Sequence, residues 1–341
     1  MVLEHLFPDN WLEKKFTFSI LLASGYSLIG IILARLLFGA NSGLASVMFT
    51  AILLIPSLRK LFEAEERREE REKKFTLKEL YKDNKHLIKA YLGIFIGVYV
   101  TYFLVSFISM KLGLDTYSIF KEQVFLDTAL KGRATFSSDM FWSILHNNWW
   151  VLVACFLLSL ISGSGATFFV VWNASAWAVI FAVRSNLAAQ VTTFSPEGAA
   201  AMLVLITLPH VLLEGGAYIL AGIAGAILSD DVISDAKDLK KFLAGAVLAG
   251  AGFWLVNYTL KAFMEMSASL YVLRMTAFLG FLYLISRTFH DKKHKEVFIY
   301  NYWLFAIALL VFVVGALVET FVLGNSNTLN FIYSAAYQAA G

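Results

Sequence analysis

Residues 199–229 read AAAMLVLITLPHVLLEGGAYILAGIAGAILS, and this apolar stretch decides the fold class. A helix of these 31 residues, at about 1.5 Å each, would be about 46 Å long. The hydrocarbon core of a bilayer is only about 30 Å thick. We therefore predict an all-α membrane protein in which this segment crosses the bilayer and tilts, extends beyond it or breaks.

Two ionisable residues, His210 and Glu214, lie inside this stretch. A charged side chain at the centre of a bilayer costs roughly 2.5–3.5 kcal/mol on insertion scales, so such residues are kept where they have partners or a function. Their i,i+4 spacing places both on one helix face, where the imidazole N–H can reach the carboxylate. Asn173 lies near the middle of another apolar segment. We predict one intramembrane cluster of these three residues, serving either helix packing or the handling of a proton or ion.

Residues that weaken a helix flank the His210–Glu214 pair on both sides. Pro209 precedes it and removes a backbone donor, and Gly215 and Gly216 follow it. The spacing predicts a bend or break in this helix between residues 205 and 216.

The composition supports an integral membrane protein. Hydrophobic residues make up 59% of the chain and aromatic residues 15%, more apolar surface than a soluble fold of this length can bury. The single cysteine, Cys155, excludes disulfides within the chain and makes a thiolate metal cluster implausible. We expect no cofactor, no metal centre and no nucleic-acid partner.

Hydropathy predicts about nine membrane spans in a polytopic helix bundle. Lysine and arginine concentrate in alternate connections, above all in residues 59–89, which predicts an N-terminus inside and a C-terminus outside. We expect a multi-pass protein of the plasma (cytoplasmic) membrane, in contact with membrane lipid. The expected spans are residues 16–37, 44–58, 90–110, 149–161, 167–183, 199–229, 242–260, 270–286 and 302–323.

We divide the chain into three parts. Residues 1–58 form an N-terminal transmembrane hairpin, and residues 59–89 form a charged cytoplasmic helix that continues the second span. Residues 90–341 form the transmembrane core, with an outer loop at 112–148 and an added hairpin at 242–286. The charged helix is either a solvated connector or a docking surface for an unknown protein partner.

Further polar and small residues complete the candidates. Arg274 and Glu319 lie at matching depths near the outer ends of their spans, which predicts a salt bridge between them. Small residues recur every fourth position at Ala217, Ala221 and Gly225, and such stripes let helix backbones approach closely. Tight packing within the chain is the simpler use of this stripe, and a homo-oligomer face is the alternative.

Residues 147–230, together with the last span, resemble the stage II sporulation protein M family of integral membrane proteins. The resemblance is carried by Asn147-Asn148 at the end of the outer loop, Trp172-Asn173, Leu208-Pro209-His210-x-x-x-Glu214, Ala221-Gly222-x-x-Gly225 and Glu319. It implies a non-catalytic membrane subunit that works with partner proteins in envelope or membrane remodelling. Members occur outside spore formers, archaea included, so this chain resembles a non-sporulating member with extra spans.

The sequence therefore supports two hypotheses about the function. The first is a non-catalytic membrane scaffold or complex subunit, favoured by the resemblance and by the charged segment 59–89. The second is a transporter or channel-like protein that handles a proton, ion or lipid at a site formed by His210, Glu214 and Asn173. We expect no enzymatic activity, and an intramembrane hydrolase is the least favoured reading.

Overall fold

A computed structural model describes residues 16–39, 42–69, 77–128, 138–233, 244, 258–259, 268–287 and 292–339. All regular elements in these ranges are helices, as expected for segments in lipid, where each backbone N–H and C=O must be paired within the protein. They are α2 (Phe16–Phe38), α3 (Gly43–Glu69), α4 (Leu77–Lys111), α5 (Thr116–Ile119), α6 (Lys121–Thr128), α7 (Ser138–Ser162), α8 (Ala166–Val191), α9 (Pro196–Ile233), α11 (Ala268–Ser286), α12 (Lys292–Asn325) and α13 (Asn327–Ala339).

Seven of the described helices are long and apolar enough to cross a membrane: α2, α3, α4, α7, α8, α9 and α12. They coincide with seven of the nine expected spans. Most of the expected span 242–260 lies outside the described residues. The expected span 270–286 forms α11, whose apolar part, Tyr271–Ser286, is shorter than the roughly 20 residues that cross a bilayer upright. The count of nine and the orientation therefore stay predictions.

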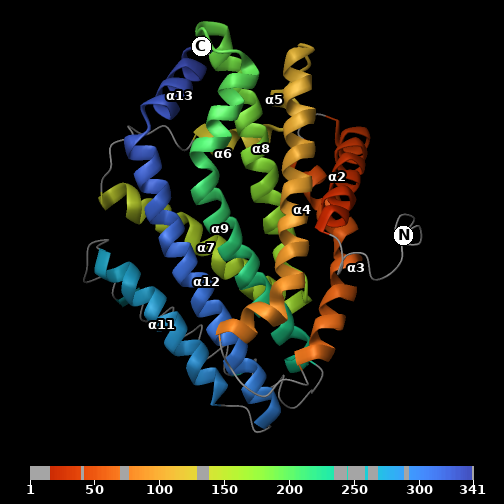
Figure 1. Cartoon of the computed structure of the whole chain (residues 1–341), viewed down its shortest axis with the longest axis vertical. Helices are drawn as coiled ribbons and strands as arrows, with labels where there is room; N and C mark the ends of the chain where they lie inside the picture. The colour runs from red at the N-terminus through yellow and green to blue at the C-terminus, as the bar shows by residue number, and fades with distance from the viewer. Residues whose placement is uncertain are drawn as a thin grey trace.

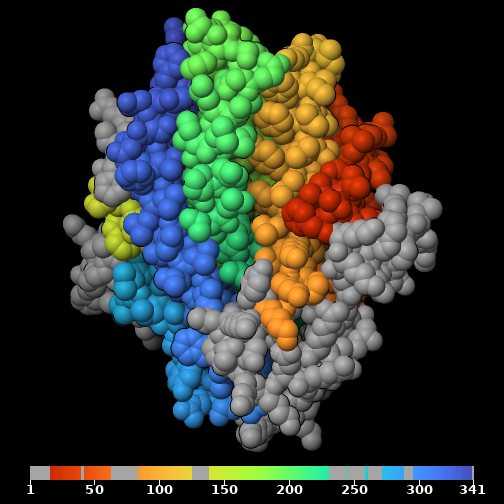
Figure 2. Space-filling view, in the orientation of Figure 1, coloured from red at the N-terminus to blue at the C-terminus, as the bar shows by residue number. Residues whose placement is uncertain are grey.

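Helix α9 lies at the centre of the bundle. It packs against α12 and α7 on one side and against α8 and α4 on the other (Figure 1). One stripe of α9 remains at the surface, where Leu205, Leu208 and Leu212 are 69%, 40% and 49% exposed. Figure 2 shows this green surface between the blue of α12 and the orange of α4. Within the apolar part of α9, Thr207, His210 and Glu214 are buried on its enclosed faces.

The sequence predicted a bend or a break in this helix. Helix α9 is continuous through Pro209, so a break is absent, and the bend stays a prediction. Gly215 and Gly216 also keep helical geometry, since the only glycines with a positive φ among the described residues are Gly39, Gly113 and Gly163. Proline removes one backbone hydrogen bond from a helix, and glycine lowers the local stability of a helix. The packing of α9 on several sides compensates for both losses. The site on α9 is therefore carried by an intact helix.

Glycines in the second half of α9 allow close contact with α7 and α8. A Cβ atom at Gly225 would collide with the backbone oxygen of Phe156 in α7, and one at Gly222 would collide with the Cβ of Ala166 in α8. Ala217 and Ala221, from the same stripe, are fully buried within the bundle. The stripe of Ala217, Ala221 and Gly225 is thus used inside the bundle, and a homo-oligomer stays a prediction.

The charged segment 59–89 is divided between two helices in its described parts. Helix α3 continues the second span to Glu69, beyond the apolar stretch that ends at Phe62. Helix α4 begins at Leu77, ahead of the third apolar stretch, which starts at Asn84. Residues 70–76 lie outside the description. Both spans therefore extend past their apolar parts as charged helices.

The expected outer loop 112–148 is helical over much of its length. Helices α5 and α6 follow α4, and α7 already begins at Ser138. Phe120, between α5 and α6, is fully buried against Tyr102, with ring centroids 5.8 Å apart. The Gln123 amide donates to the carbonyl oxygen of Gly43 at 3.2 Å. This segment is thereby packed onto α3 and α4.

The C-terminal helix α13 folds back onto α8. Arg184 of α8 is only 5% exposed, and its guanidinium lies 3.9 Å from the ring centroid of Tyr337 and 5.7 Å from that of Tyr333. A cation over an aromatic face is stabilised by the ring quadrupole. Helix α13 therefore covers a buried charge.

Candidate functional site

The candidate site begins where α12 crosses α9. Gly315 of α12 lies directly against Glu214 of α9, since a Cβ atom at position 315 would be 3.0 Å from the Cγ of Glu214 and 3.3 Å from its backbone nitrogen. The absent side chain lets the two helices approach closely. Glu319 follows Gly315 by four residues, about one helical turn, and so lies on the same face. Gly315 thus positions Glu319 beside Glu214.

The two carboxyl groups share a side-chain hydrogen bond. Glu214 is only 2% exposed, whereas Glu319 is half-buried and its Oε2 atom is enclosed without a hydrogen-bond partner. An ionised carboxylate can only accept hydrogen bonds, so a bond between two carboxyl groups requires a proton on one of them. The arrangement is therefore an acid pair that can hold a proton.

A third helix supplies the next partner. Asn148, in α7, donates from its Nδ2 to Oε1 of Glu214 at 2.9 Å. The amide of Asn147 donates in turn to Oδ1 of Asn148 at 3.2 Å. An amide donor supports negative charge on Glu214 without adding a charge of its own. The paired asparagines thus connect the acid pair to the exposed N-terminal half of α7.

His210 lies one turn before Glu214 but is not bonded to it. The imidazole is 5% exposed, and its Nδ1 is enclosed without a hydrogen-bond partner. The described hydrogen bonds of Glu214 go to Asn148 and Glu319, from two neighbouring helices, instead of to the histidine of its own helix. The expected His210–Glu214 hydrogen bond is therefore replaced by bonds between helices.

Asn173 does not join the acid pair by a described hydrogen bond. Its Nδ2 donates to the carbonyl oxygen of Phe169, one turn back in its own helix, at 2.8 Å. Short polar side chains commonly satisfy themselves in this way inside a helix. The expected cluster of three residues is replaced by Glu214, Glu319 and Asn148.

Arg274 and Glu319 do not form the expected salt bridge in the described residues. Glu319 is bonded to Glu214, whereas the Arg274 guanidinium lies 5.6 Å from the ring centroid of Tyr271. Tyr271 is held by α7, since its ring stacks on Trp142 with centroids 5.7 Å apart. The sequence predicted matching depths for the two residues, but depth does not determine the direction in which each side chain points.

Tyr218 belongs to the site and was missed in the sequence. It lies one turn after Glu214, is 2% exposed and interacts electrostatically with both carboxyl groups. Its i+4 spacing from Glu214 was the available signal. One face of α9 therefore presents three titratable side chains on successive turns: His210, Glu214 and Tyr218. No group of three or more metal-ligating side chains occurs among the described residues.

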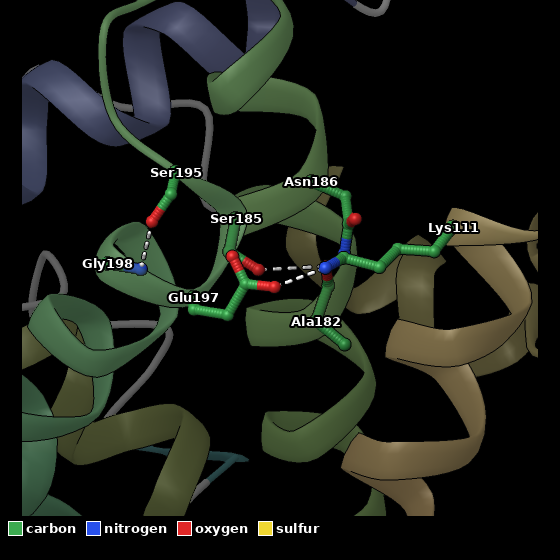
Figure 3. A network of polar contacts seen from close by, with 7 residues as sticks. All are labelled: Lys111, Ala182, Ser185, Asn186, Ser195, Glu197 and Gly198. Atoms are coloured by element: carbon green, nitrogen blue, oxygen red, sulfur yellow. Dashed lines mark hydrogen bonds and ion pairs between the residues drawn. The ribbon is translucent and has the colours of Figure 1, made fainter.

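A separate polar network fixes the opening turn of α9 (Figure 3). Lys111, the last residue of α4, forms an ion pair with Glu197 in the first turn of α9. The hydroxyl of Ser195 accepts from the backbone N–H of Gly198 at 3.0 Å and caps the helix. Asn186 of α8 donates to the carbonyl oxygen of Ala182 at 2.7 Å. This network joins the ends of α4 and α9 beside α8, away from the acid pair.

Comparison of the chain with protein-family models, curated proteins and solved structures finds no match. The fold itself defines the class of protein, a multi-pass helical membrane protein. The resemblance to the stage II sporulation protein M family stays a prediction from the sequence.

Proposed function

We propose that the protein is a transport protein that takes up and releases a proton at the Glu214–Glu319 pair. The observation that carries the proposal is the hydrogen bond between the buried carboxyl of Glu214 and the half-buried carboxyl of Glu319, which belong to different helices. Two like charges at this separation disfavour each other's ionisation, so one proton is held in preference to none. Ionisable residues inside membrane bundles commonly mark proton and ion pathways.

The neighbours of the pair support proton movement to and from it. His210 and Tyr218 lie one turn to either side on α9, and both side chains can donate and accept hydrogen bonds. The enclosed Nδ1 of His210 has hydrogen-bonding capacity that the described residues leave unused. Many transporters place their sites at broken helices. Helix α9 is continuous, so this site is formed by side chains instead of by exposed backbone groups.

The first test asks whether the pair holds a proton. Infrared difference spectra of the purified protein should contain the carbonyl band of a buried protonated carboxyl at neutral pH. The band should shift in Glu214→Gln and in Glu319→Gln, because the partner of the remaining carboxyl changes, and it should vanish in the double variant. The matched control is Glu197→Gln, which alters an exposed carboxyl of the same helix. A band that survives in the Glu214→Gln/Glu319→Gln double variant would contradict the shared proton.

The second test asks whether the proton moves. Proteoliposomes containing a pH-sensitive dye should change internal pH when a potassium diffusion potential is imposed. Glu214→Gln and Glu319→Gln should lose this proton flux, and Glu197→Gln should keep it. Equal flux in all three variants would exclude the pair from the pathway.

A membrane scaffold remains the second candidate, and one observation favours it. Helices α3 and α4 extend beyond their apolar stretches as charged helices, which offers a docking surface for a protein partner of the plasma membrane. Co-purification from the native host followed by mass spectrometry tests this proposal. A scaffold should retain its partner in Glu214→Gln and lose it when the charges of 59–89 are replaced. A transport protein should lose its proton flux in Glu214→Gln and keep it when the charges of 59–89 are replaced.

A further inference from the structure

Arg274 carries a partly buried positive charge with no described anionic partner. Its Nε atom is enclosed and has no hydrogen-bond partner, and its described contacts are with aromatic side chains. A guanidinium has five N–H donors, and leaving such donors unmet in a poorly hydrated place is unfavourable. Arg287, which directly follows the same helix, differs from Arg274 because it is exposed and donates to the hydroxyl of Tyr283 at 3.2 Å.

Aromatic side chains from α7 and α11 surround this charge. Tyr271 lies under the guanidinium, stacks on Trp142 with an interplanar angle of 8°, and contacts His146 with centroids 5.2 Å apart. His146 also packs edge-on against Trp150 at 6.4 Å. Tryptophan and tyrosine gather at the level of lipid headgroups in membrane proteins. An arginine among such rings is therefore typical of the headgroup region.

The neighbourhood of Arg274 is also open to lipid chains. Helix α11 lies on the outer flank of the bundle beside α12 (Figure 1). Val272 and Leu273 are 52% and 42% exposed, and Trp150 is 50% exposed. The exposed apolar side chains beside the Arg274 guanidinium are complementary to a ligand that has an anionic headgroup and apolar tails.

We propose that Arg274 binds the phosphate group of an anionic phospholipid beside the aromatic cluster formed by Tyr271, Trp142 and His146. The guanidinium fork matches phosphate oxygens in a bidentate geometry, which a lysine cannot reproduce. His146, whose ring centroid lies 5.2 Å from that of Tyr271, offers a second donor through its imidazole N–H. The exposed apolar residues beside this cluster select a lipid over free phosphate.

The test compares ligands on the purified full-length protein in detergent. Phosphatidylglycerol, phosphatidylcholine with the same acyl chains, and inorganic phosphate are added at equal concentrations, and thermal unfolding is followed. The melting temperature should rise most with phosphatidylglycerol. Arg274→Gln should lose this preference, Arg274→Lys should keep only part of it, and the matched control Arg287→Gln should keep all of it.

Two outcomes would overturn the assignment. The first is an unchanged preference for phosphatidylglycerol in Arg274→Gln. The second is a response of the unmodified protein to inorganic phosphate that equals its response to phosphatidylglycerol. If Arg274→Gln does not fold, brominated lipids replace the variant. Tryptophan fluorescence of the unmodified protein should then be quenched more by brominated phosphatidylglycerol than by brominated phosphatidylcholine, and equal quenching would overturn the proposal.

Discussion

Replacing Asn148 by leucine removes the amide donor that reaches Oε1 of Glu214 at 2.9 Å and keeps the branched shape of the side chain. A hydrogen bond to a charged acceptor contributes about 1.5–3 kcal/mol, whereas bonds between transmembrane helices average about 0.6 kcal/mol and reach about 1.7. The acceptor here is a carboxyl that is 2% exposed, so the upper part of the membrane range applies. We expect Asn148→Leu to cost about 1.5 kcal/mol, or about 2 °C in melting temperature for a chain of 341 residues.

A double-mutant cycle measures whether this cost comes from the acid pair. In Glu214→Gln the acceptor is neutral, so Asn148→Leu should cost roughly 1 kcal/mol less there than in the unmodified protein. The control is Asn173→Leu, which loses only a hydrogen bond to Phe169 in its own helix and should cost less than about 0.5 kcal/mol. Equal costs of Asn148→Leu in both backgrounds, or an equal cost for Asn173→Leu, would refute the reasoning.

Two further predictions concern helix packing and topology. Gly225→Ala places a Cβ against the backbone of α7 and should lower stability by about 1–3 kcal/mol. Gly216→Ala meets nothing within 4 Å and should be neutral or stabilising by up to about 1 kcal/mol, so a similar melting point for both variants would contradict the close crossing. Because the only native cysteine is buried, Lys82→Cys should react with an impermeant thiol reagent from the inner side and Thr193→Cys from the outer side. Reaction of both from one side would contradict the predicted orientation.

Hydropathy located the helices well because a lipid environment leaves the backbone few alternatives. The clearest difference is α7, expected at 149–161 and observed as Ser138–Ser162. Its first half contains His146, Asn147 and Asn148, whose polarity ended the predicted span although the backbone remains helical. Hydropathy indicates which residues are apolar enough to lie within the membrane. It does not indicate where the backbone hydrogen bonds of a helix end.

The sequence predicted the residues of the site, but it did not predict which of them contact one another. Glu214, Glu319 and Asn148 were all candidates, yet Glu214 was paired with His210 and Glu319 with Arg274. Spacing along one helix and depth in the membrane can be derived from a sequence. The rotation of each helix about its axis cannot, because it is set by contacts such as Gly315 against Glu214.

The separation of the two acids along the chain has a consequence for biogenesis. Helix α9 is synthesised and enters the membrane well before α12, so Glu214 reaches the hydrocarbon before Glu319 exists. During that interval the carboxyl must enter in neutral form, with Asn148 of α7 as the partner already made. Arrival of α12 completes the pair, so Glu214 gains its second partner only when almost the whole chain has been synthesised.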